Sequence, residues 1–441
     1  MSAAGLDEPA GTGLSVDRPP PGPGALRDSE TGKAVGLAAA TMAANLVAIV
    51  FTVIFTRLLG AEDYGSLAAL LNLTVICFVP GSALQVAAAR EGALGRLGGG
   101  GELAATLARW MRHLLLGIGG LTALAVLARE PLASLLNVDE EWAAAAVVPT
   151  AGLWLVLSVQ RGLLQSTRAY RPVGLSIVLE ALGRLAAGAL LVALGLGVSG
   201  AYLGTLSSFA IASVALGVVL RRRLGPPAPH SRRHPLRELA RDAAVPIGAL
   251  TLVAALQNVD VIMAKHALDE DTAGVYAAAT VAAKAVVWIA VGLGLYVLPE
   301  AARRAASGAD ARVVLLRGLA VIGTISLVAL AAFGTIPGLL LRLAFGPEYE
   351  SGDVVLPALG GAFALLAATY LGVQFLLGLR RRGFVLVLLA AAIAEPVLLW
   401  DATTLTGFAA MVLLVQAAAA VVILGLSLAR APVPAPAASP T

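Results

Sequence analysis

The sequence is poor in charged residues, cysteine and histidine, and each shortage excludes a class of protein. Charged residues make up 13% of the 441 residues, against roughly 25% in a typical soluble chain. The single cysteine, Cys77, excludes an internal disulfide framework. The four histidines are too scattered to suggest a metal site. No phosphate-binding loop motif and no Ser/His/Asp arrangement occurs, so we expect no enzyme, no ATPase and no bound cofactor or metal.

Apolar residues are correspondingly abundant and make up 59% of the sequence. Runs of about 18 or more apolar residues are typical of membrane spans, and the period-2 alternation of barrel strands is absent. We therefore predict an all-α polytopic membrane protein with about twelve transmembrane helices. The predicted helices cover about 34–56, 66–89, 111–129, 143–161, 173–195, 200–220, 243–264, 275–298, 313–335, 354–378, 383–400 and 406–428.

The charges between these helices alternate in sign. Connections after even-numbered helices hold most of the arginines, including Arg161, Arg221–Arg223 and Arg380–Arg382, whereas those after odd-numbered helices hold most of the acids. Basic residues are enriched on the cytoplasmic side of a membrane. We therefore expect a cell (inner or cytoplasmic) membrane protein whose two termini are both cytoplasmic. The net charge of +4 then indicates topology, and we expect no nucleic-acid partner.

Two pairs of segments resemble each other across the chain. The turn "LLGAEDYGSLAAL", in which Gly60 can end the first helix, matches "ALDEDTAGVYAAAT" at 267–280, and "QRGLLQSTRAY" from Gln160 matches "QFLLGLRRRGF" from Gln374. Six helices per half would relate the halves by an axis along the membrane normal. The predicted organisation is a disordered cytoplasmic tail (1–32), an N-lobe (33–222), an Arg-rich cytoplasmic linker (223–242), a C-lobe (243–430) and a disordered tail (431–441).

Several charged residues fall inside the predicted helices, where an unpaired charge is costly. Lys284 has no acid at helical spacing and is the best candidate for a cation that faces a cavity; the alternative is a structural partner elsewhere in the fold. Glu180 and Arg184 stand four residues apart, so they can form a self-neutralising pair or face the cavity. Asp260 and Glu395 are candidates for coupling or gating.

The neighbours of these acids leave their roles open. Asp260 follows Gln257 and Asn258, and this polar cluster could line the external mouth or simply reach the interface. Glu395 precedes Pro396, whose kink could expose the carboxylate or merely bend the helix.

Lone amides inside apolar runs form a further group of candidates. Asn45, Gln85, Gln160 and Gln374 are typical of hydrogen bonds between helices, and Asn45 and Gln85 are also candidate cavity residues.

The first turn resembles that of a known family. Arg57, Leu59, Gly60, Tyr64 and Gly65 match an R-x-L-G-x-x-x-Y-G pattern, and Arg57 is a further gating candidate. With "QVAAARE" and "VQRGLLQSTRAYRPVGL", the chain resembles, over about residues 31–430, the polysaccharide-transporter (O-antigen flippase-like) branch of the multidrug/oligosaccharidyl-lipid/polysaccharide (MOP) exporter superfamily.

This resemblance implies two six-helix lobes around a central cavity that opens alternately to either side. The implied substrate is an undecaprenyl-pyrophosphate-linked oligosaccharide, such as an O-antigen repeat unit for lipopolysaccharide, moved to the outer leaflet. Membrane lipids, a polysaccharide polymerase and glycosyltransferases are the implied partners. By position, Lys284 would meet the pyrophosphate, with Arg184 second.

Three other functions remain open. An ion-coupled multidrug or cation antiporter of the same superfamily would use acids such as Asp260 and Glu395. A membrane glycosyltransferase or polymerase would need a long external loop, which the sequence lacks. A non-transporting scaffold would tolerate Lys284→Ala.

Overall fold

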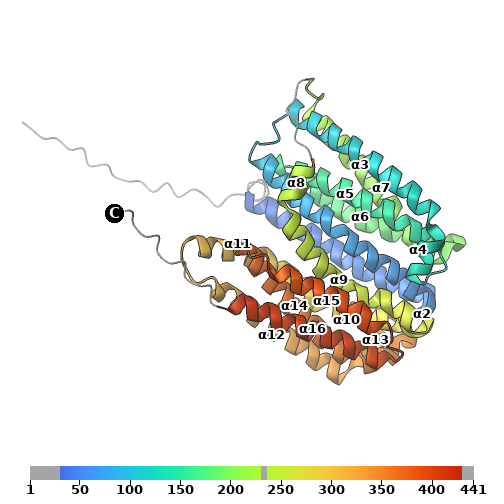
Figure 1. The fold of residues 1–441 in the computed structure, drawn as a ribbon. Helices are drawn as coiled ribbons and strands as arrows, with labels where there is room; N and C mark the ends of the chain where they lie inside the picture. Colours follow the sequence, from blue (N-terminus) through green and yellow to red (C-terminus); the bar gives the residue numbers. More distant parts are fainter. Residues whose placement is uncertain (1–29, 230–235, 430–441) are drawn as a thin grey trace, which may run out of the picture.

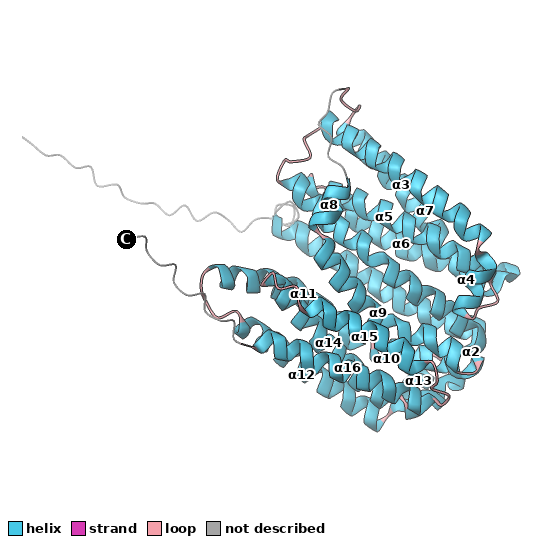
Figure 2. Ribbon diagram, viewed as in Figure 1, coloured by secondary structure: helices cyan, strands magenta, loops and turns pink. Residues whose placement is uncertain are grey.

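The computed structural model describes residues 30–229 and 236–429. Within these ranges the chain is built from helices joined by short connections, and no strand is present (Figure 2). Nearly all of both predicted tails, and residues 230–235 of the predicted linker, lie outside the described residues.

The first half of the chain forms six long helices. The 64-residue α2 (Glu30–Ala93) contains the first two predicted helices, which meet at Gly60 with φ 77°. Glycine adopts this left-handed conformation without steric cost, which explains the turn. The other elements of this half are α3 (Gly101–Leu127), α4 (Arg129–Leu136), α5 (Glu141–Ser166), α6 (Tyr170–Leu191), the π turn η1 (Val192–Leu196) and α7 (Gly197–Leu224).

The second half follows the short helix α8 (Leu236–Asp242). The predicted eighth helix consists of two segments, α10 (Glu270–Ala283) and α11 (Ala285–Ala306), which are separated at Lys284. Asp269 caps α10 by accepting the Thr272 N–H at 3.0 Å, and this bond lowers the pKa of Asp269. The other elements are α9 (Ala244–Ala267), α12 (Arg312–Thr335), α13 (Pro337–Ala344), the 3-10 turn η2 (Pro347–Val354), α14 (Leu356–Gly378), α15 (Phe384–Leu399) and α16 (Leu405–Leu428).

The predicted fold class is confirmed. In the described residues, nine apolar segments are long enough to cross a membrane, and two of them, 39–93 and 170–224, span 55 residues each and contain two helices. The shorter α15 adds a further apolar helix. Leucines such as Leu127 (82% exposed) and Leu327 (74% exposed) cover the outer surface. Such a surface suits lipid, so the chain is a multi-pass membrane protein.

The two halves form two groups of helices that meet along α2, which packs against both α9 and α10 (Figure 1). The end of the bundle that holds Gly60, α4 and η2 is called here the Gly60 end. The opposite end holds the arginines of 221–223 and 380–382 and is called the arginine-rich end. The predicted lobe boundaries stay predictions.

Two glycines allow α2 and α10 to cross closely at the Gly60 end. A Cβ on Gly65 would lie 3.2 Å from the Gly274 nitrogen, and a Cβ on Gly274 would overlap the Ala61 carbonyl oxygen. The contact is reciprocal, because Gly65 faces Gly274 and Glu270 while Gly274 faces Ala61, four residues before Gly65. Reciprocal contacts are typical of a two-fold axis, which supports the internal repeat in the predicted register.

The second pair of similar segments, from Gln160 and from Gln374, also corresponds in the structure, but with a shift of two residues from the sequence alignment. α5 and α14 are each followed by an arginine in the left-handed conformation, Arg168 (φ 57°) and Arg380 (φ 56°). At both ends the next residue's N–H returns to the carbonyl of Leu164 or Leu376, which is the Schellman pattern of helix termination. The helix ends therefore pair Leu164 with Leu376, two positions away from the alignment on Gln160 and Gln374.

Candidate functional site

Lys284 stands at the junction of α10 and α11. Its N–H donates to the Thr280 carbonyl at 2.9 Å, and its own carbonyl accepts the Val287 N–H at 2.9 Å. The backbone of Lys284 keeps helical dihedrals (φ −66°, ψ −13°), and its carbonyl also accepts the Trp288 N–H at 3.4 Å. The two helices are therefore joined at Lys284 by a locally tightened turn.

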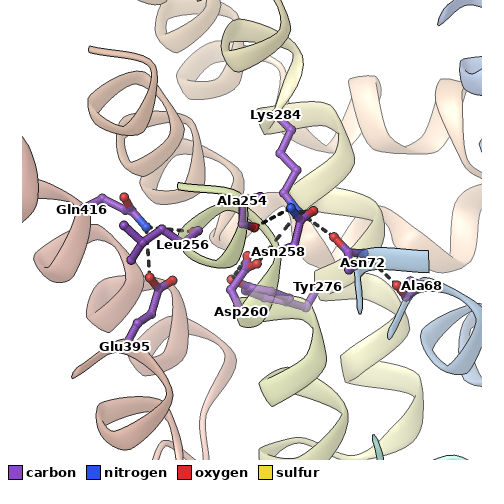
Figure 3. A network of polar contacts seen from close by, with 10 residues as sticks. All are labelled: Ala68, Asn72, Ala254, Leu256, Asn258, Asp260, Tyr276, Lys284, Glu395 and Gln416. Carbon is purple, nitrogen blue, oxygen red and sulfur yellow. Dashed lines mark hydrogen bonds and ion pairs between the residues drawn. The ribbon is translucent and has the colours of Figure 1, made fainter. Parts of the chain in front are cut away.

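The Lys284 ammonium faces polar groups from two helices, α2 and α9 (Figure 3). Its Nζ donates to Asn72 Oδ1 at 2.9 Å and to Asn258 Oδ1 at 3.4 Å, and it lies 3.9 Å from Asp260 Oδ1. The ring of Phe363 on α14 lies 5.4 Å away. Only 5% of Lys284 is exposed, so in this conformation the ammonium faces protein groups.

Asp260 is therefore an acidic partner of Lys284 that lies on another helix, outside helical spacing. Asp260 is fully buried, and its Oδ2 accepts the Tyr276 hydroxyl at 2.9 Å. In this conformation Asp260 therefore lies inside the protein and not on its surface. Sequence spacing could not find the pair, because the two charges lie on different elements, α9 and the α10–α11 junction.

Glu395 belongs to the same polar region. It is fully buried in α15, and its Oε2 accepts Gln416 Nε2 at 3.1 Å, while the same Nε2 donates to the Leu256 carbonyl of α9 at 3.0 Å (Figure 3). Pro396 therefore does not expose the carboxylate. Among the described residues, Asp260 Oδ1, Glu395 Oε1 and Gln416 Oε1 have no hydrogen-bond donor. The two carboxylate oxygens could accept a proton, and all three oxygens are of the type that hard cations bind.

The contact between Lys284 and Asn72 joins the two halves of the chain, since these residues stand 212 positions apart. Asn72 also donates to the Ala68 carbonyl of its own helix at 2.7 Å, which fixes its amide so that Oδ1 faces the ammonium. Separation of α2 from α9 and α10 would break the shorter of the two hydrogen bonds of Lys284.

A second buried ion pair lies within the first half. Arg161 Nη2 donates to Glu180 Oε2 at 3.0 Å, and Arg161 Nε donates to Ser176 Oγ at 3.0 Å. Arg161 also lies over the Trp154 ring at 5.5 Å. Two expectations are corrected here: Arg161 is a buried residue of α5 and not a loop charge, and Glu180 pairs with it and not with Arg184.

Arg184 occupies the face of α6 that meets α2. Its guanidinium lies 4.9 Å from the Phe51 ring, and its Nε has no hydrogen-bond partner in the described part of the chain. Arg184 and Lys284 contact different residues, so the structure does not bring the two candidate cations into one cluster.

The contacts around Lys284 are called here the Lys284 network, and its members are Asn72, Asn258, Asp260, Tyr276, Lys284, Phe363, Glu395 and Gln416. The remaining candidates are not members of it. Gln85 links α2 to α5 through Gln165 at 3.4 Å, and Gln160 donates to the Ser213 carbonyl of α7, which confirms both as interhelical contacts. Asn45 is exposed on α2 and Gln257 is half-buried on α9, next to the network member Asn258.

Arg57 lies at the Gly60 end, where it joins the two halves. Its Nη2 donates to the Leu343 carbonyl of α13 at 3.1 Å. Nearby, the Tyr349 hydroxyl donates to the Thr56 carbonyl at 3.1 Å. These cross-half contacts and the Gly65–Gly274 crossing close this end of the bundle.

Four members of the network were not predicted from the sequence: Asn72, Tyr276, Phe363 and Gln416. Asn72 and Gln416 carry the same signal as Asn45 and Gln85, a lone amide in an apolar run. Tyr276 and Phe363 carry no signal, because aromatic residues in membrane helices usually pack in the core.

The family described as polysaccharide biosynthesis protein matches residues 32–298, more than half of the chain. The chain belongs to this family. The matched region includes Asn72, Asn258, Asp260 and Lys284, while Glu395 and Gln416 follow it. No curated protein matches the chain.

Solved structures share the fold at low identity. A multidrug resistance MATE family transporter of the MOP superfamily, in an inward-facing conformation, gives a TM-score of 0.72 at 13% identity, covering 89% of this chain and 97% of the transporter. Lipid II flippase MurJ, in an inward closed conformation, gives 0.68 at 11%, covering 88% and 87%. An outward-facing MATE transporter gives 0.58 at 14%, covering 91% and 96%. The chain therefore shares its fold with these transporters and with MurJ.

Proposed function

We propose that this protein is a flippase that moves a polyprenyl-pyrophosphate-linked oligosaccharide from the cytoplasmic to the outer leaflet by alternating access. The observation that carries the proposal is a buried cation, Lys284, at the contact between the two halves, in the region that matches the family. MurJ, one of the proteins with this fold, is a lipid II flippase.

The proposed work has a clear physical requirement. Sugar hydroxyls and a pyrophosphate lose their hydration in hydrocarbon, and each unpaired polar group costs several kcal/mol there. A polar cleft between the halves removes this barrier while the polyprenyl tail stays in lipid. A cation inside that cleft compensates the phosphate charge through charge-assisted hydrogen bonds.

Lys284 would serve as this cation only while the halves are apart. When α2 moves away, Asn72 leaves the ammonium, and a phosphate oxygen of the substrate takes its place. Asp260 stays with Lys284 because both belong to the second half. When the halves close again, Asn72 replaces the phosphate, which keeps binding weak enough for release.

The proposed transport runs from the cytoplasmic to the outer leaflet of the inner membrane. The arginine-rich end would face the cytoplasm, as basic residues prefer, with both termini on that side of the inner membrane. Glycosyltransferases would supply the lipid-linked substrate there, and a polysaccharide polymerase would consume it on the other side.

The decisive experiment separates the charge of Lys284 from its structural pairing. Lys284→Gln alone leaves Asp260 buried without its cation, which is destabilising. The double variant Lys284→Gln/Asp260→Asn removes both charges, so we expect it to be present at normal level. Its export should still fall about tenfold or more, because a charge-assisted hydrogen bond contributes about 1.5–3 kcal/mol. The measurements are exported polysaccharide in cells that depend on this protein, and protein level in the membrane.

The matched control uses the other buried ion pair. Arg161→Gln/Glu180→Gln removes two charges of similar burial from the first half, and we expect export near the unmodified level. Normal export by Lys284→Gln/Asp260→Asn would overturn the role of Lys284, and so would an equal loss in both double variants.

An ion-coupled antiporter is the second candidate, favoured by the donor-free oxygens of Asp260, Glu395 and Gln416 in the described residues. Vesicles that contain the protein would then move a cationic dye in exchange for protons or sodium. Glu395→Gln should abolish this exchange, while the exposed Glu348→Gln should not. Absence of any dye exchange by the unmodified protein would exclude this function.

A further inference from the structure

A cavity of about 790 Å³ opens at the arginine-rich end, away from the Lys284 network. Arg241 of α8 lines it together with Arg380, Arg381 and Arg382, which stand in the turn between α14 and α15. The first residues of α9, 244–246, and Leu377 of α14 supply an apolar wall. The volume is that of a small-molecule site.

The four guanidinium groups have no acidic partner among the described residues. None of them forms an ion pair there, and Arg381 Nη1 donates only to the Leu426 carbonyl of α16, at 3.1 Å. Like charges gathered around one cavity repel each other unless an anion occupies it. The cavity is thus suited to a group with more than one negative oxygen.

Arg380 lines the cavity at the end of α14. It occupies the left-handed position of that terminus, with φ 56°, as Arg168 does at the end of α5 with φ 57°. This conformation therefore belongs to the way both helices end, and the placement of Arg380 at the cavity is what bears on binding.

The occupant must also suit the apolar wall. A free phosphate would gain nothing from Leu377 and Pro246, whereas an amphiphile would contact them with its glycerol or isoprenoid carbons. We infer that this cavity binds the phosphate headgroup of a lipid from the adjacent leaflet, either a phospholipid or a polyprenyl phosphate.

Basic residues at a cytoplasmic membrane surface are common, so the test needs a control for charge alone. Arg222 and Arg223 provide it, because they are exposed at the same end of the bundle but do not line the cavity. They carry the same charge as Arg380 and Arg382.

The experiment is a lipid titration of the purified full-length protein, read by native mass spectrometry. Phosphatidylglycerol is the probe and phosphatidylcholine the neutral reference. Arg380→Gln/Arg382→Gln should weaken phosphatidylglycerol binding about fivefold per arginine, and Arg222→Gln/Arg223→Gln should leave it unchanged. Ala244→Trp fills the cavity without changing its charge and should also weaken binding.

Three outcomes would overturn the inference. These are equal weakening by the two arginine pairs, no effect of Ala244→Trp, and competition by inorganic phosphate as strong as that by phosphatidylglycerol. The same titration with undecaprenyl phosphate separates the two lipid sources, since the tighter lipid is the occupant. The titration contains no transport step, so a failure here leaves the flippase proposal intact, and a failed export experiment leaves the lipid site intact.

Discussion

At the scale of single residues, the buried ion pairs Arg161–Glu180 and Lys284–Asp260 differ in their geometry. Arg161 and Glu180 contact each other at 3.0 Å, with Ser176 and Trp154 completing the surroundings of the guanidinium. Lys284 stands farther from its acid, at 3.9 Å, and makes its shortest hydrogen bond to the other half of the chain. The first pair lies within one half of the chain, whereas Lys284 also makes a hydrogen bond across the two halves.

The Arg161–Glu180 pair should matter mainly for stability. Glu180→Gln leaves the Arg161 guanidinium, whose side chain is 3% exposed, without a counter-charge. Breaking such a pair costs about 3–5 kcal/mol. We expect a lower unfolding temperature in detergent, followed by the intrinsic fluorescence of the five tryptophans, of which Trp154 is adjacent to Arg161. Arg161→Gln/Glu180→Gln should recover part of the loss, and equal unfolding temperatures for the single variant and the unmodified protein would contradict the prediction.

Arg380 should show the opposite balance between stability and binding. Arg380→Gly relieves the left-handed backbone strain and should stabilise the fold by about 1 kcal/mol, while weakening phosphatidylglycerol binding. Arg380→Lys keeps both the charge and the strain, so its unfolding temperature should stay unchanged. A glycine variant that unfolds at a lower temperature would show that the arginine side chain stabilises the turn itself.

At the scale of elements, the sequence predicted helix ends well wherever apolar runs stop sharply. The predicted 313–335 and 406–428 agree with α12 and α16 to within one residue at each end. The third helix begins at Gly101 and not near 111, because arginines such as Arg109 were taken as connection residues although they lie on a helix. The tightened turn at Lys284 was not predicted, since lysine is no helix breaker.

The close crossing of α2 and α10 is the element on which closure of the Gly60 end depends. Gly274→Ala places a methyl group against the Ala61 carbonyl, so the two helices must part. We expect a larger distance between spin labels at Glu62→Cys and Asp271→Cys, two exposed sites in opposite halves. Gly117→Ala, with open space around it, should leave that distance unchanged. An unchanged distance in Gly274→Ala would exclude the crossing as the closing contact.

At the scale of the whole molecule, the all-helical fold and its division into halves followed from hydropathy, charge and repeats. The site did so only in part: Lys284, Asp260, Asn258 and Glu395 were candidates, but their mutual contacts were not. Helical spacing reports neighbours on one helix, whereas the decisive contact joins residues 212 positions apart. A single sequence holds no record of such a pairing.

The topology of the whole molecule gives the last prediction, because basic residues stay on the cytoplasmic side. In a Cys77→Ser background, single cysteines at Glu62 and Asp271 should react with a membrane-impermeant maleimide on intact cells. Cysteines at Arg222 and Arg382 should react only after permeabilisation. All four positions are exposed in the structure, so protection by the membrane and not by folding decides the result. Reaction of either arginine position on intact cells would contradict the prediction that the arginine-rich end faces the cytoplasm. The proposed substrate and the proposed lipid headgroup would then come from the outer leaflet.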